Sequence, residues 1–118
     1  MKFEELNKRL IKTSTDKEIF TKSSAYNQAL YTQSELDELK QSLTAYENGL
    51  DFYTNSKGEK VNTIEQIMDD YGDIMNTLFN GMKFFDEYFE PLEAFEHSLI
   101  IFENRKGKTI NGSFKKDE

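Results

Sequence analysis

A one-sided row of carboxylates is the feature of this sequence with the clearest chemical consequence. Residues 61–103 contain ten acidic side chains against one basic side chain, Lys83, whereas the whole chain has a net charge of only −7. Residues 64–89 have helical periodicity, and at about 100° per residue four of the carboxylates share the side opposite the apolar stripe. These four belong to Glu65, Asp69, Asp73 and Glu87. Like charges at this spacing repel one another, so the row is either ordinary solvated surface or a surface shaped for a basic partner.

Two aromatic residues flank this row instead of joining the apolar stripe. Phe84 and Tyr88 fall beside the acidic side of the predicted helix. Aromatic side chains at the edge of a charged face are typical anchors of protein interfaces. The alternative is that both rings meet another helix of the same fold. The predicted partner-binding set is therefore Glu65, Asp69, Asp73, Phe84, Glu87 and Tyr88.

Residues for catalysis or metal binding are scarce. His97 is the single histidine, cysteine is absent, and no glycine-rich phosphate loop or serine elbow occurs. Asp69, Asp70 and Asp73 lack the alternating ligands of a calcium loop. We therefore expect no catalytic residues, no metal site, no cofactor and no enzymatic activity.

The overall charge restricts the class of partner. A chain with pI near 4.8 lacks the cationic surface that nucleic acids and anionic membranes require. No apolar run approaches the roughly 20 residues that span a bilayer, so we expect a cytoplasmic protein. An acidic field attracts basic proteins. The sequence thus favours a protein-binding inhibitor or adaptor of a basic, nucleic-acid-handling partner, in its sharpest form a nucleic-acid mimic of the kind that phages and other mobile elements carry.

The elements that must position these residues are mostly helices. Helical spacing predicts a helix over 2–12, and capping-box pairs predict helices that begin near Thr15, Thr32 and Thr63. The stripe from Leu36 to Tyr53 follows heptad spacing until Asn48-Gly49 ends the helix. The strongest stripe favours one long helix over 64–89, with its apolar side in the core. Asn80-Gly81 either bends this helix or breaks it into two. Pro91 opens the last helix, which reaches about residue 104.

These segments predict an all-α fold, a small bundle of about four to five helices with one long acidic amphipathic helix. Residues 50–62 form either a loose loop or a short β-hairpin. The predicted domain covers 1–104, and 105–118 is a basic polar tail expected to be flexible, although Asn111-Gly112 is a hairpin-turn signal. The heptad stripe and the apolar run 99–102 favour a second function class, a homodimeric or larger structural assembly, or an assembly chaperone. No known family is identified from the sequence.

Overall fold

The computed structural model describes residues 1–117, so the last residue of the predicted tail, Glu118, lies outside the described part. The chain divides into two units, one ending at Phe85 and one beginning at Asp86. The first unit contains α1 (Phe3–Asp16), α2 (Ile19–Lys22), α3 (Ala25–Glu47), β1 (Phe52–Thr54), β2 (Lys60–Asn62) and α4 (Thr63–Lys83). The second contains α5 (Pro91–Glu103), β3 (Gly107–Ile110) and β4 (Ser113–Lys116). The predicted helical bundle with a short hairpin near 50–62 is confirmed.

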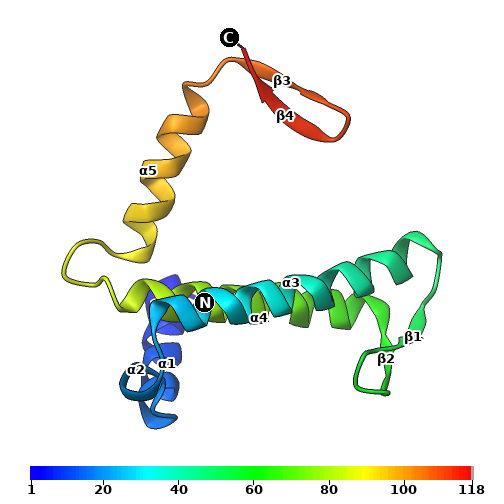
Figure 1. Ribbon diagram of the computed structural model, residues 1–118, viewed down its shortest axis with the longest axis horizontal. Helices are drawn as coiled ribbons and strands as arrows, with labels where there is room; N and C mark the ends of the chain where they lie inside the picture. Colours follow the sequence, from blue (N-terminus) through cyan, green and yellow to red (C-terminus); the bar gives the residue numbers. More distant parts are fainter. Residues whose placement is uncertain (118) are drawn as a thin grey trace. The chain divides into compact units, whose positions relative to one another are not determined.

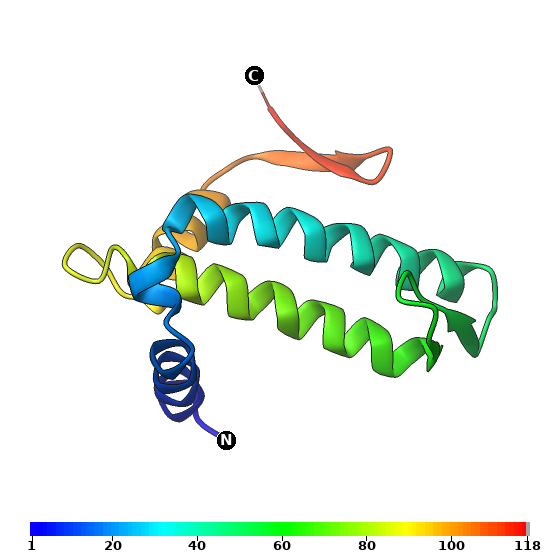
Figure 2. The same cartoon turned by 60° about the horizontal axis from the view of Figure 1, so that its bottom comes forward.

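The first unit is organised around two long helices. α3 and α4 lie side by side and run in opposite directions, joined at one end by the β1–β2 hairpin (Figures 1 and 2). α1 and α2 lie at the other end of this pair. Ser24 caps α3 by accepting from the Asn27 N–H, and Asn62 caps α4 by accepting from the Glu65 N–H.

Three predicted helix boundaries were wrong. Ser24 rather than Thr32 begins α3, since Thr32 uses its hydroxyl inside the helix to bond the Gln28 carbonyl. α1 continues through Thr15, whose hydroxyl likewise bonds the Ile11 carbonyl instead of opening a second helix. The helix predicted over 64–89 ends at Lys83, close to the Asn80-Gly81 pair. The predicted end at Asn48-Gly49 is confirmed, with Gly49 at a φ of 73°.

The contact between α3 and α4 is polar where the sequence predicts an apolar core. Most of the buried side chains of the first unit are polar: Ser14, Gln28, Ser42, Thr63, Asp70 and Asn80. Leu39 and Ala45 are the buried apolar residues of the described chain. The apolar stripe of α4 is only partly covered, because Ile67 and Ile74 are half-buried whereas Ile64, Met68, Tyr71, Met75 and Leu78 are exposed. This corrects the expectation that the whole stripe faces the core. Short side chains let the two helices approach closely, and hydrogen bonds satisfy the buried polar groups.

The second unit is a helix followed by a hairpin. α5 begins at Pro91, as predicted, and the Glu90 N–H donates to Glu93 Oε1 at 3.3 Å. β3 and β4 pair antiparallel around Asn111 and Gly112, which have φ values of 52° and 81°, typical of a type I′ turn. The apolar run 99–102 is helical and exposed.

Candidate binding surface on the α3–α4 pair

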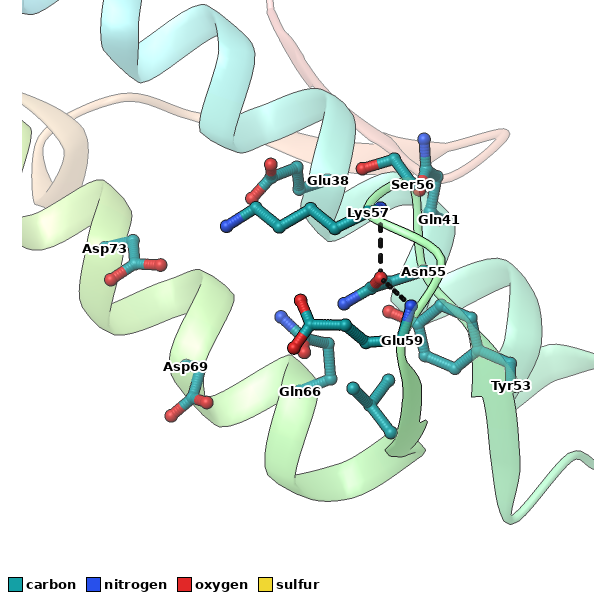
Figure 3. Close-up of a pocket in the computed structure, with 11 residues that line it drawn as sticks. Glu38, Gln41, Tyr53, Asn55, Ser56, Lys57, Glu59, Gln66, Asp69 and Asp73 are labelled. Carbon is teal, nitrogen blue, oxygen red and sulfur yellow. Dashed lines mark hydrogen bonds between the residues drawn. The ribbon is translucent and has the colours of Figure 1, made fainter.

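A pocket of about 350 Å³ lies where α3, the β1–β2 hairpin and α4 converge. Figure 3 shows the side chains that line it, with Glu38 from α3, Tyr53 and Asn55 from the hairpin, and Asp69 and Asp73 from α4. The full lining is Glu38, Gln41, Tyr53, Asn55, Ser56, Lys57, Glu59, Val61, Gln66, Asp69 and Asp73. Two of the predicted site residues therefore lie in its wall.

The hairpin loop forms one wall of the pocket because a single side chain shapes its turn. Asn55 Oδ1 accepts hydrogen bonds from the backbone N–H groups of Lys57 and Glu59, each at 3.0 Å (Figure 3). Gly58 has a φ of 79°, a conformation that other residues rarely adopt. This turn directs the Lys57 side chain toward Glu38 and Asp73. The loop therefore supplies the single cation among the pocket-lining residues.

The pocket carries more negative than positive charge. Four lining carboxyl groups, those of Glu38, Glu59, Asp69 and Asp73, surround the one ammonium group of Lys57. Burial, followed by the charges of Asp69, Asp70 and Glu38, raises the pKa of Asp73, while Lys57 lowers it. A cation that entered the pocket would relieve this repulsion.

Beside the pocket, a second carboxyl group on α3 has a still larger shift. Burial, followed by the nearby charges of Glu38 and Asp73, raises the pKa of Glu35 to about 7. One oxygen of this group, Glu35 Oε2, is buried and accepts no hydrogen bond from residues 1–117. Near neutral pH this group is poised between its protonated and ionised forms.

Asp70, in the buried contact between the helices, interacts with two residues that line the pocket, Gln66 and Tyr53. Asp70 is fully buried, and its two oxygens accept hydrogen bonds from Ser42 Oγ and Gln66 Nε2, each at 2.7 Å. Burial, then the charge of Asp70, raises the pKa of Tyr53. Asp70 thus fixes Gln66 in the pocket wall. This role was not predicted from the sequence, in which only Asp69 and Asp73 share the acidic side of the helix.

The predicted acidic row is shorter than expected. Glu65, Asp69 and Asp73 are exposed on α4 and share its side, as the spacing indicates. Glu87 lies beyond the end of α4 and in the second unit, so it does not extend the row along this helix. The reason is that the helix stops at Lys83, one turn before the position at which Glu87 would rejoin that side.

The two predicted aromatic anchors have different environments. The Phe84 ring packs edge-on against Phe20 with 5.6 Å between centroids, which matches the alternative that it contacts another helix. Tyr88 belongs to the second unit and is 78% exposed. His97 lines a separate pocket of about 420 Å³ in the second unit, with Ser98, Arg105 and four apolar residues.

Neither a metal centre nor a membrane segment accompanies this surface in the part of the chain that the structure describes. Among residues 1–117, no three histidine or acidic side chains are grouped as metal ligands would be. None of the helices within that range carries the sustained apolar run that crossing a bilayer requires.

Comparison of the chain with models of protein families, with curated proteins and with solved structures found no match.

Proposed function

We propose that this protein is a non-enzymatic, acidic protein-binding module that inhibits or adapts a basic partner of the kind that handles nucleic acid. The observation that carries the proposal is the pocket between α3, the hairpin and α4, where four carboxyl groups face one cation. A lysine or arginine side chain of a partner would enter this pocket and pair with Glu38 and Asp73. Glu65 and Asp69 would extend the contact along α4.

The acidic row on α4 can be compared with a nucleic acid by its charge per unit length. Residues four apart on a helix are separated by about 6 Å along its axis. One strand of DNA carries a phosphate for each 3.4 Å or so of axis. Glu65, Asp69 and Asp73 alone therefore supply about half the linear charge of one strand, and the pocket residues Glu38 and Glu59 supplement it.

Raised carboxyl pKa values support a cation as the ligand. Glu35 and Asp73 bear unfavourable negative neighbours before binding, and a bound cation would stabilise their ionised forms. Binding would then release protons at neutral pH.

The direct test measures binding of an arginine-rich peptide, and of basic proteins captured from a lysate, to the full chain at low and high salt. Asp69→Lys/Asp73→Lys should abolish binding. Asp37→Lys/Glu47→Lys makes the same charge change at exposed positions of α3 outside the pocket and should reduce binding only slightly. Complexes that survive roughly 0.5 M salt, where the Debye length is about 4 Å, would contradict charge-based recognition.

Assembly is a second candidate function, favoured by a different observation. Five apolar residues from Ile64 to Leu78 are exposed on one side of α4, and α5 also exposes its apolar run. A homo-oligomeric structural protein or an assembly chaperone would use such surfaces.

A further inference from the structure

The exposed apolar side of α4 has the spacing of a coiled-coil seam. Its residues follow one another at steps of four, three, four and three, and we call them the α4 seam: Ile64, Met68, Tyr71, Met75 and Leu78. Each is between 47% and 68% exposed. Such regular heptad spacing is what a partner helix packs against, yet α4 uses another side for α3.

The position of α3 explains why the seam is uncovered. α4 contacts α3 through Asp70, which accepts from Ser42, through Thr77, which is 2.7 Å from the Thr32 hydroxyl, and through Gly81. At 100° per residue this contacting side lies about 120° from the seam. α1 lies beside α4 only from Gly72 onward, where Phe3 packs on Phe79 and Met75 of the seam lines a pocket together with residues of α1.

The apolar residues of α3 extend the seam into a two-helix face. Viewed from the N-terminus of each helix, the seam lies to one side of the α4 surface that contacts α3. Leu36 and Leu43 lie to the same side of the α3 surface that contacts α4. Because the helices are antiparallel, equal senses of rotation place both sets on one side of the pair. Glu38 and Asp73, which are rotated the other way, line the acidic pocket together and so confirm this geometry.

A second pocket lies at the hairpin end of this apolar face. It has a volume of about 360 Å³ and brings Tyr46, Leu50 and Phe52 next to Ile64, the first residue of the seam. Each of these four side chains is about half exposed. The apolar face therefore runs from the hairpin along both helices, opposite the acidic pocket.

The charges around the seam indicate which partner it fits. The positions that flank a coiled-coil seam are occupied here by Glu65, Ile67, Gly72, Ile74, Phe79 and Gly81. Only Glu65 among them is charged, so the seam offers a basic partner almost nothing to pair with. A second copy of this acidic chain would likewise meet little repulsion there, although its net charge is −7.

We propose that two copies of this chain dimerise through the α4 seam and the adjoining residues of α3. With about ten large side chains half exposed, the face offers on the order of 800 Å² for burial, the area that each partner in a stable interface contributes. A two-fold axis pairs the face with itself, as in most homodimers. The two acidic pockets then lie on the outer sides of the dimer, both accessible to ligands.

The test is the mass of the full chain by sedimentation equilibrium between roughly 1 and 100 μM, a range set by ordinary dimer affinities. We expect twice the 13.8 kDa chain mass. Met68→Glu/Met75→Glu, two exposed seam positions, should give the chain mass, whereas Gln33→Glu/Thr44→Glu adds the same charge elsewhere on α3 and should leave the dimer. A wild-type chain that is monomeric at every concentration overturns the proposal. A dimer whose mass is unchanged in the seam variant also overturns it.

A second measurement covers the case in which the seam variant unfolds by circular dichroism. The chain has no cysteine, so Tyr71→Cys introduces a single thiol at the centre of the seam. Mild oxidation should cross-link this variant and not Gln33→Cys; equal cross-linking of the two overturns the proposal. Because the acidic pocket lies on the other side of the helices, a folded seam variant should bind the arginine-rich peptide as the wild type does, which separates failure of the dimer from failure of the proposed function.

Discussion

Ser42 and Asp70 join the two long helices of this protein by a 2.7 Å hydrogen bond between fully buried side chains. The Ser42 hydroxyl on α3 donates to Asp70 Oδ2 on α4, and Gln66 donates to the other oxygen of the same carboxyl group. A buried polar group that keeps its partners contributes modestly to stability, whereas one that loses them costs its full desolvation energy. The helix pair therefore depends on this contact although no large apolar residue takes part in it.

Replacing Asp70 should consequently destabilise the fold, whereas replacing its neighbour should not. Asp70→Ala leaves the Gln66 amide without its acceptor and the Ser42 hydroxyl with only the Leu39 carbonyl, so it should lower the free energy of unfolding by about 2–3 kcal/mol. Asp69→Ala, at an exposed position one residue away, should change it by less than about 0.5 kcal/mol. Urea denaturation followed by circular dichroism measures both. Equal losses for the two variants would show that the Ser42–Asp70 contact does not hold the helices together.

The raised pKa of Glu35 makes stability depend on pH. The folded state binds the Glu35 proton up to about pH 7, whereas the unfolded state releases it near 4.5. The folded protein therefore holds more protons within this window, and its stability should fall as pH rises from about 4.5 to 7. Because the group is partly solvated, we expect a loss of about 1 kcal/mol. Glu35→Gln should remove this part of the pH dependence and raise the melting temperature at pH 8, with Glu47→Gln as an exposed control.

The same ionisation should make cation binding stronger at higher pH. Protonated carboxyl groups attract a cation less, so the affinity for an arginine-rich peptide should rise between pH 6 and 8 as Glu35 ionises. Calorimetry in two buffers of different ionisation enthalpy should detect proton release. Binding that weakens over this range would point to a ligand other than a cation.

Replacing glycine by alanine should have opposite effects on stability at two positions of the first unit. Gly72 is inside α4 and has open space where a Cβ would lie, so Gly72→Ala should stabilise the protein by about 0.5–1 kcal/mol. Gly58 has a φ of 79° in the hairpin turn, where Gly58→Ala should cost about 1 kcal/mol. Thermal unfolding of both variants is the measurement, and a stabilising Gly58→Ala would contradict the turn geometry.

Alanine substitution of Phe84 should lower stability, whereas alanine substitution of Tyr88 should not, because only Phe84 packs against another ring. Phe84→Ala removes the ring contact with Phe20 and should lower stability by about 1–3 kcal/mol, less than a fully buried phenylalanine would. Tyr88→Ala truncates a side chain that is 78% exposed and should leave stability unchanged. A loss of peptide binding in Tyr88→Ala with normal unfolding would establish it as an interface anchor.

The sequence by itself determined which segments are helical and some of their ends. Heptad spacing identified α3 and α4, Asn48-Gly49 marked the end of α3, and Pro91 opened α5. These features are local, because the apolar period and the capping residues act within a few residues of the chain. The same local signals located Glu65, Asp69 and Asp73 on one side of α4.

Only the tertiary structure decided which side of each helix is buried. The apolar stripe of α4 suggested that side for the core, but α3 packs on the neighbouring side, where Ser42 and Asp70 bond and short side chains permit close approach. That choice depends on contacts between residues 28 positions apart, which no local pattern records. It also brought Glu38 beside Asp73 and turned a row of surface acids into a pocket.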